Sequence, residues 1–130
     1  MTRGAASVGV ALLFAAAAGG VAGCRGSRSE PTAVHIDGAD PHRGETIMET
    51  YGCGACHTIP GVRGAKGVVG PPLNAWAERG YIGGELPNTP RNLVTWVMDP
   101  PSIEPNTAMP NLGVDEVEAK DIAAYLYTLD

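Results

Sequence analysis

Aromatic side chains are scarce in this sequence. Its 130 residues include one Phe, two Trp and four Tyr, against 18 Gly and 11 Pro. Small domains bury a smaller share of their surface than large ones, so each large apolar side chain matters more to their stability. The chain has little with which to fill a core, and we expect something other than side chains to occupy part of it.

Basic residues are also few. Nine Lys and Arg stand against 14 Asp and Glu, which gives a formal charge of −5 at pH 7. Omitting residues 1–23, which include Arg3, makes the charge −6. Binding to nucleic acid rests on positive charge that neutralises phosphates. This balance excludes nucleic acid as an expected partner.

Hydrophobic runs long enough to cross a bilayer are absent as well. The main apolar run extends from Val8 to Ala18, whereas a membrane span needs about 20 residues. The run follows Arg3 and precedes small residues, which is the layout of a secretory signal. We therefore expect residues 1–23 to be a signal peptide.

The end of this signal resembles the lipobox of bacterial lipoproteins, with the residues Val21-Ala22-Gly23-Cys24. The resemblance implies cleavage before Cys24, a lipid on that cysteine, and an exported, membrane-anchored protein facing the periplasm or the cell exterior. An ordinary signal that leaves Cys24 free, or an uncleaved anchor, is the alternative. Residues 24–39 mix Ser, Gly, Pro and charges without periodicity, which predicts a flexible tether without fixed structure.

The remaining chain, residues 40–130, is predicted to be one all-α domain. No alternating pattern typical of strands occurs in it. Asp40 and Thr89 each precede a proline, the pattern of an N-cap followed by the first helical residue. They predict helices over 41–51 and about 90–98.

The last helix has the clearest sequence pattern. Asp115 and Glu118 form a capping box, and an apolar stripe follows and extends to Leu129. A short helix over 74–78 is compatible with the sequence. Residues 100–113 are rich in proline and are expected to form a loop.

The stretch Cys53-Gly54-Ala55-Cys56-His57 concentrates two thiols and an imidazole in five residues. Its spacing fits three kinds of site. A redox-active dithiol usually accompanies a βαβ pattern, which is not seen here. A structural zinc site needs four ligands, and His35, His42 and Cys24 do not lie at paired spacing to complete one. A c-type haem attachment site joins both thiols to haem and places the histidine under the iron.

Other motifs follow the order found in the class I, monohaem cytochrome c family. Gly44 and Met48 lie four residues apart before the cysteines, GPPL follows at 70–73, and MP at 109–110 precedes the helix that contains DIAAYL. Over residues 40–130 the chain therefore resembles that family. The resemblance implies the cytochrome c fold, with three to five helices around one covalently bound haem c.

The resemblance also implies a role for the thiols and for two axial ligands. Cys53 and Cys56 would form the thioether bonds to haem. His57 and Met109 would coordinate the iron from its two sides. Met98 is the competing methionine, but its place in a predicted helix favours a packing role.

Pro71 and Leu73 take supporting roles in the family pattern. The Pro71 carbonyl would accept the imidazole N–H and orient the ring, and Leu73 would pack against the haem. Gly44 would let the first and last helices cross closely, with Tyr125 beside the crossing. A glycine inside a helix costs up to about 1 kcal/mol relative to alanine, and such a crossing would explain it.

Four further side chains are candidates for the haem propionates or the pocket wall: Trp76, Arg79, Tyr81 and Trp96. Each carries an N–H or O–H donor that could offset the negative charge of a buried propionate. The three aromatic side chains could instead pack against the haem through their rings. His35 and His42 are expected to be exposed.

The stretch LPNTPRNLVTW at 86–96 suggests a narrower likeness. It looks like the cytochrome domain fused to subunit II of some bacterial haem-copper oxidases, although the copper-binding domain with its paired cysteines is not seen in this sequence. We expect a one-electron carrier rather than an enzyme. Its donor and acceptor would be redox proteins, with a terminal oxidase as one candidate. A permanent electron-entry subunit of a larger complex, and an open-haem enzyme or sensor, are the alternatives.

Overall fold

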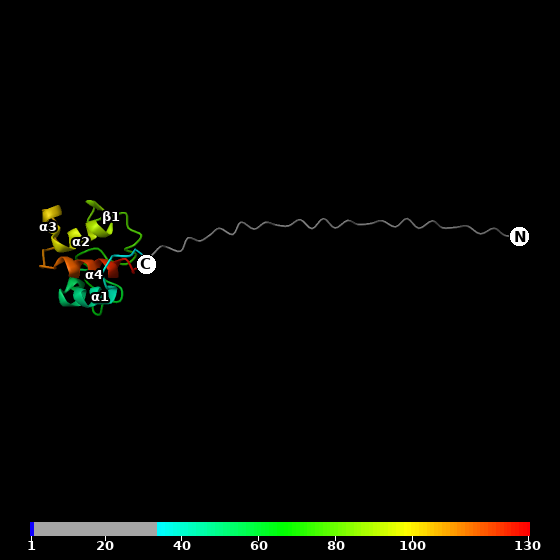
Figure 1. Cartoon of the computed structure of the whole chain (residues 1–130), viewed down its shortest axis with the longest axis horizontal. Helices are drawn as coiled ribbons and strands as arrows, with labels where there is room; N and C mark the ends of the chain where they lie inside the picture. The colour runs from blue at the N-terminus through cyan, green and yellow to red at the C-terminus, as the bar shows by residue number, and fades with distance from the viewer. Residues whose placement is uncertain (2–33) are drawn as a thin grey trace. The chain divides into compact units, whose positions relative to one another are not determined.

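The computed structural model describes residue 1 and residues 34–130 (Figure 1). The expected lipid site at Cys24 and, apart from Met1, the expected signal peptide lie outside the described residues. Within residues 34–130 no helix is both long and apolar enough to span a bilayer.

The last part of the expected tether, residues 34–39, has a defined turn. The Ala39 N–H donates to the Ile36 carbonyl at 3.1 Å, and the Ile36 side chain packs against the hydrophobic core. The expectation of no fixed structure up to residue 39 is therefore wrong for these residues. The reason is one apolar side chain in a polar segment, whose partial burial offsets the entropy lost in ordering a short turn.

The described part of the chain contains four α-helices, which confirms the all-α prediction. They are α1 (Pro41–Thr50), α2 (Pro90–Met98), α3 (Pro100–Ile103) and α4 (Glu116–Leu126). Asp40 and Thr89 each accept a hydrogen bond from a first-turn N–H, at 2.9 and 3.3 Å, and proline follows both. Asp115 and Glu118 form the expected capping box at the start of α4. Local capping thus explains where these helices begin.

Residues 81–87 form a small hairpin that we did not predict from the sequence. Strand β1 (Tyr81–Ile82) pairs antiparallel with β2 (Leu86–Pro87). Gly83, Gly84 and Glu85 connect the strands. Both glycines have positive φ, which glycine adopts without strain. Two residues per strand are too few for an alternating pattern to be recognised.

Two other segments also differ from expectation. Residues 74–78 form two turns instead of a helix, and Ala75 there has a φ of 48°, in the left-handed region. The loop expected over 100–113 begins with α3. Pro100 and Pro101 end α2, but their fixed φ also suits the first turn of a new helix.

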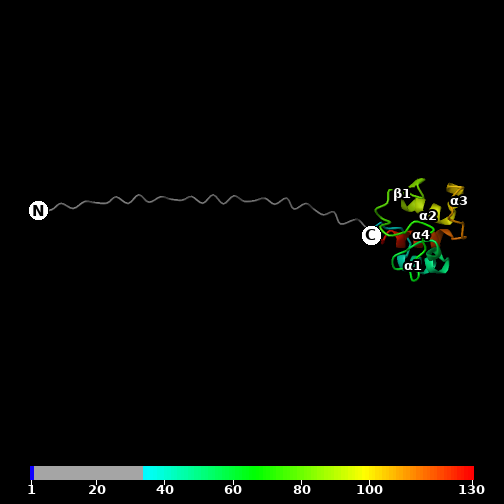
Figure 2. The ribbon, with the colours of Figure 1, turned by 180° about the vertical axis from the view of Figure 1, so that it is seen from behind.

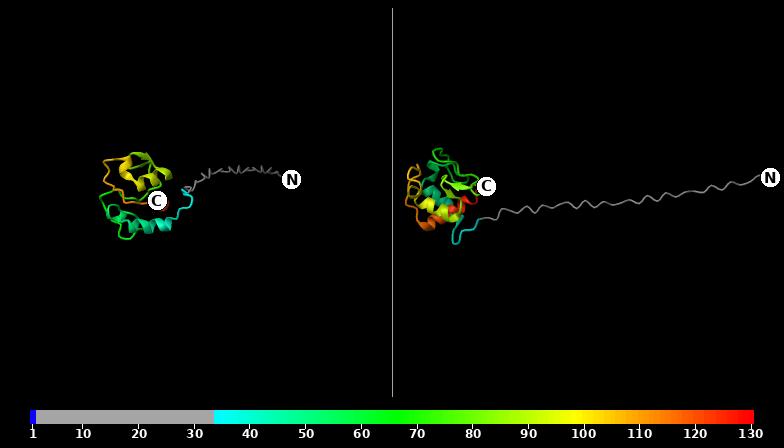
Figure 3. Two further views of the ribbon diagram at one scale, coloured as in Figure 1. Left: turned by 60° about the vertical axis from the view of Figure 1, so that its left-hand side comes forward. Right: turned by 90° about the horizontal axis from the view of Figure 1, so that it is seen from above.

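Helix α4 lies between α1 on one side and α2 on the other (Figures 1 and 2). In the left view of Figure 3 the C-terminus likewise lies between α1 and α2. Gly44 is buried at the contact of α1 with α4, and a Cβ at this position would lie 2.1 Å from the Asp121 carbonyl oxygen. Only glycine lets the α1 and α4 backbones come this close, so the close crossing of the first and last helices at Gly44 is as expected.

An ion pair between a partly exposed arginine and a buried aspartate joins α1 to α4 beside this crossing. The Asp121 side chain is 2% exposed and accepts hydrogen bonds from Arg43 Nε at 2.8 Å, Arg43 Nη2 at 2.9 Å and the Asp40 N–H at 2.7 Å. The hydrogen-bonded Arg43 guanidinium holds the pKa of Asp121 below its ordinary value. At the other end of α1, the Tyr51 hydroxyl donates to Glu118 Oε2 at 2.6 Å. The two helices are therefore joined at both ends of α1.

The core contains four of the six aromatic side chains in the described part of the chain. Its buried aromatic side chains are Trp76, Trp96, Tyr125 and Tyr127. Aliphatic residues from α1, α2, α4 and the loops complete it, among them Met48, Ile59, Leu73, Ile82, Leu93, Val97, Ile122 and Leu126. The core thus connects the helices to the loops that contain the predicted site residues Leu73 and Met109.

Candidate functional site

The segment from Cys53 to His57 follows α1 and begins with the 3-10 helix η1 (Cys53–Ala55). The amides of Cys56 and His57 both donate to the Cys53 carbonyl, at 3.2 and 3.0 Å, so the segment is tightly wound. Both thiols are free; Cys53 is half-buried and Cys56 is exposed. Burial raises the pKa of the Cys53 thiol. Both sulfur atoms are available for covalent attachment.

The His57 ring is oriented by a backbone carbonyl. Its Nδ1 lies 2.7 Å from the Pro71 oxygen. Because that oxygen can only accept, Nδ1 is the donor, and the other ring nitrogen, Nε2, is the one that can coordinate a metal. Gly70 is pressed against the same ring: a Cβ there would lie 2.3 Å from His57 Cε1. The structure therefore brings His57 and Pro71 together as expected, and Nε2 remains free to bind a metal.

A loop is bonded directly onto the cysteine segment. The Gly67 and Gly70 amides donate to the Gly54 and Cys56 carbonyls, at 3.0 and 2.8 Å. Leu73, two residues beyond Pro71, is buried in the core. The cysteines, the histidine and the GPPL segment consequently form one rigid unit, in which Leu73 supplies apolar surface.

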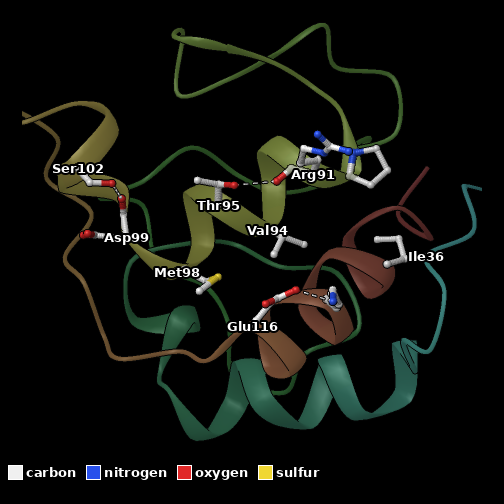
Figure 4. A pocket seen from close by; sticks show the side chains of 10 residues that line it. Ile36, Arg91, Val94, Thr95, Met98, Asp99, Ser102 and Glu116 are labelled. Carbon is white, nitrogen blue, oxygen red and sulfur yellow. Dashed lines mark hydrogen bonds and ion pairs between the residues drawn. The ribbon is translucent and has the colours of Figure 1, made fainter.

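The two candidate methionines lie in different surroundings. Met109 is half-buried in the loop between α3 and α4 and packs against the core. Its amide donates to Thr107 Oγ1 at 3.2 Å. Met98 lines a surface groove with Ile36 and Val94 (Figure 4). Neither cysteine of the motif nor His57 lines that groove. Met98 therefore has the surroundings of a packing residue.

Trp76 and Arg79 are brought together beside an unmet hydrogen bond. Among the described residues, one buried side-chain nitrogen has no partner, and it is Trp76 Nε1. The Arg79 guanidinium lies over the Trp76 ring, 5.0 Å from its centroid. Its Nη2 donates to the carbonyls of Pro72 and Asn74, the latter at 3.0 Å. A buried unpaired donor is costly, so an acceptor is expected at Nε1, and the adjacent cation favours an anionic one.

The other two candidates from the sequence lie apart from this pair. Trp96 is buried on α2, with its ring so close to the hairpin that a Cβ at Gly83 would lie 2.5 Å from it. The Tyr81 side chain is 65% exposed on β1. Trp96 thus belongs to the core wall, while Tyr81 is mainly in contact with solvent.

Asn88 is a site residue that sequence reasoning missed. Its Nδ2 donates to the carbonyls of Trp76 and Arg79, both at 3.0 Å, and its Oδ1 accepts from the Tyr127 hydroxyl at 2.8 Å. Burial raises the pKa of Tyr127 to about 12, so the hydroxyl remains a donor at neutral pH. The partners of Asn88 lie 12, 9 and 39 residues away. Asn88 belongs to the LPNTP stretch singled out in the sequence, but no local pattern predicts its hydrogen bonds to Trp76, Arg79 and Tyr127.

Comparison with known proteins assigns the fold to a family. The family model described as "Cytochrome c" matches residues 41–130. The chain belongs to the cytochrome c family. One relative of this cytochrome c domain is "Cytochrome c oxidase subunit 2" of Alkalihalophilus pseudofirmus, 32% identical over 91 residues. The match covers 68% of this chain and 25% of the relative, so the chain spans about a quarter of that protein's length.

Members of the cytochrome c family bind haem covalently and transfer electrons, which favours haem attachment over the dithiol and zinc interpretations of the motif. The donor set of this cytochrome c domain fits haem c. It offers two free thiols, an imidazole whose Nδ1 is bonded to a carbonyl so that Nε2 is the available ligand atom, and an unpaired indole N–H beside a guanidinium. Among residues 34–130, no group of three or more His, Cys, Asp and Glu side chains is placed to hold a metal ion directly.

Proposed function

We propose that this cytochrome c domain is a one-electron carrier with a single haem c attached through Cys53 and Cys56. The family match over residues 41–130 supports haem-based electron transfer. The hydrogen bond from His57 Nδ1 to Pro71 is the observation that carries the site assignment, because it prepares the imidazole as a ligand. Bound haem supplies the redox chemistry, and the protein supplies attachment, ligands and electrostatic environment.

His57 and Met109 are the proposed axial ligands. The Pro71 carbonyl fixes the ring and increases the basicity of the free Nε2. A thioether as the second ligand raises the reduction potential relative to two imidazoles. Two protein ligands also leave no open position for oxygen or peroxide, which agrees with electron transfer rather than an enzymatic reaction. Leu73 supplies apolar contact beside the histidine.

Met109 is favoured over Met98 by its surroundings. Both methionines are half-buried against the core, but Met109 lies in a proline-bounded loop. Met98 is part of α2, and its side chain lines the outer groove with Ile36 and Val94. A loop methionine can turn toward an iron without the cost of breaking a helix.

Trp76 and Arg79 are the proposed partners of the haem carboxylates. The unpaired Trp76 N–H needs an acceptor, and Arg79 supplies positive charge next to it. Hydrogen bonds to a carboxylate from charged or pre-placed donors are stronger than those between neutral groups. The same two residues would satisfy a buried donor of the protein and neutralise a charge of the cofactor.

We also propose that the protein is exported and held at a membrane by a lipid on Cys24, facing the periplasm or the cell exterior. The support is the pattern Val21-Ala22-Gly23-Cys24. The relative named as an oxidase subunit supports redox proteins as partners, with a terminal oxidase among the candidates. It also supports a second candidate function, a permanent electron-entry subunit of a larger redox complex.

Absorption spectroscopy tests the ligand assignment. We expect the oxidised holoprotein to show a weak near-infrared charge-transfer band from methionine sulfur to iron. The band should be lost in Met109→Ala and kept in the matched control Met98→Ala. Ready binding of carbon monoxide by the reduced wild type, together with a spectrum that Met109→Ala leaves unchanged, would contradict the assignment and support an open-haem enzyme or sensor.

Purification from native membranes separates the two candidate functions. A free carrier is expected to purify as an isolated protein after extraction with a mild detergent. Constant co-purification with the same redox subunits would instead support a permanent electron-entry subunit. Mass spectrometry of the same material tests the anchor, since a mature protein that begins at an unmodified residue other than Cys24 would rule out lipidation there.

A further inference from the structure

The loop that contains Trp76 and Arg79 has no regular secondary structure, yet its backbone is fixed. At its start, the Ala75 and Trp76 amides donate to the carbonyls of Asp130 and Leu129, at 3.2 and 2.9 Å. These bonds attach the loop to the residues that follow α4. The further end of the loop is held by a side chain from outside it.

That side chain is Asn88. Its Nδ2 donates to the Trp76 and Arg79 carbonyls, each at 3.0 Å. Both partners can only accept, so the amide nitrogen must face them and the orientation of the group is determined. Its oxygen then accepts from Tyr127, the C-terminal cap of α4, at 2.8 Å. Both donors and the acceptor of one amide are used, and they connect α4 to the loop.

Asn88 binds the carbonyls of two residues whose side chains are stacked together, Trp76 and Arg79. Trp76 Nε1 is buried and unpaired. Within the described residues Arg79 donates hydrogen bonds through Nη2, which accounts for two of the five N–H donors of a guanidinium. A buried neutral donor stacked against a cation is well suited to bind a carboxylate.

We propose that Asn88, supported by Tyr127, is a positioning residue that holds the Trp76 indole N–H and the Arg79 guanidinium toward a carboxylate of the bound haem and thereby raises its reduction potential. The inference rests on the proposed function. An ionised carboxylate without partners favours oxidised iron through its negative charge. Donors fixed in advance neutralise that charge without a cost of reorganisation.

Redox titration of the holoprotein at several pH values tests this role. Asn88→Ala removes all three side-chain bonds, and Asn88→Asp replaces the donors with an oxygen that faces two carbonyls. In both variants we expect a lower reduction potential, because the haem carboxylate loses its partners. The curve of potential against pH should have its inflection closer to neutral pH, because loss of the donors raises the pKa of that carboxylate. Asn92→Ala is the matched control: it removes one amide bond of the same kind, from Asn92 Nδ2 to Pro87 at 2.9 Å. It should change neither quantity.

Proton exchange of the indole N–H gives a readout that does not depend on electron transfer. Followed by NMR, exchange of the Trp76 Nε1 proton should be about tenfold faster in Asn88→Ala, the factor expected from losing one to two net hydrogen bonds. Combining Asn88→Ala with Trp76→Phe adds a second check. The effect of Asn88→Ala on the potential should become smaller when the indole N–H is absent.

Two results would overturn the proposal. One is an unchanged potential and inflection in a folded Asn88→Ala holoprotein. The other is faster indole exchange without a change in potential, which would make Asn88 a purely structural residue. If the Asn88 variants fail to attach haem, Tyr127→Phe removes a single bond and allows the same comparison in a folded holoprotein. Failure of the proposed function is recognised separately, by the absence of the methionine band in the wild type.

Discussion

Replacing Asp121 with asparagine should destabilise the domain by about 2–3 kcal/mol at neutral pH. All three partners of this carboxylate are donors: Arg43 Nε and Nη2, and the Asp40 N–H. An asparagine side chain has the same shape, but its NH2 group would face a donor. Breaking a buried ion pair costs about 3–5 kcal/mol. We take a lower value because the Arg43 side chain is 54% exposed and water can replace part of the interaction.

The loss should depend on pH in a defined direction. The folded-state pKa of Asp121 is lowered by Arg43. Its contribution is therefore fully present above the ordinary aspartate pKa of about 3.9 and is lost as the pH falls below that value. The difference between the wild type and Asp121→Asn should be largest at neutral pH and shrink in acid.

Urea denaturation of the holoprotein, followed by far-ultraviolet circular dichroism, measures both effects, because urea does not screen the ion pair as a salt would. For a domain of this size the loss corresponds to a decrease of roughly 10–20 °C in Tm. Glu116→Gln is the matched control: it makes the same chemical change on the same helix, in an exposed pair with Lys120 at 2.6 Å, and should cost at most about 0.5 kcal/mol. Equal losses in the two variants, or a loss that does not change with pH, would refute the reasoning.

Two further predictions concern close glycine contacts. Gly44→Ala should destabilise the domain by about 1–3 kcal/mol despite the better helix propensity of alanine, because a Cβ 2.1 Å from the Asp121 oxygen must push α1 away from α4; urea denaturation checks this, and a neutral or stabilising change would contradict it. Gly70→Ala should displace the His57 ring, since a Cβ would lie 2.3 Å from Cε1. We expect an altered Soret spectrum and a lower reduction potential, whereas an unchanged spectrum would show that the loop yields instead of the ring.

Helix starts could be predicted from the sequence because their causes are local. Asp40, Thr89 and Asp115 each cap a helix whose first residues follow at once, and a cap needs only the next three amides. The contact of Pro71 with His57 was also predicted, but from resemblance to a family rather than from spacing. Its geometry depends on a loop that folds back over 14 residues.

The features that escaped prediction depend on partners far away in the sequence. Asn88 looks like a turn residue before the N-cap of α2, and its importance comes from Tyr127, 39 residues later. The hairpin at 81–87 is stabilised by packing of Trp96 against Gly83, not by the propensity of its short strands. Helix α3 was missed because two prolines were interpreted only as a stop signal. At Asn88 and at the hairpin tertiary contacts outweigh local preference, whereas α3 has a local cause, because the fixed φ of proline also suits a first helical turn.

The bond from the Asp40 N–H to Asp121 has a mechanical consequence. It joins residues 81 positions apart at the point where the N-terminal segment enters the domain. A pull on that segment would act first as shear across the ion pair of Arg43 and Asp121 and the tight contact at Gly44. Load would therefore pass from the start of α1 into α4 before it reached the end of α1, where Cys53 begins the site. The contact of α1 with α4 at Asp121 is therefore the first part of the domain to bear a load applied at its N-terminal end.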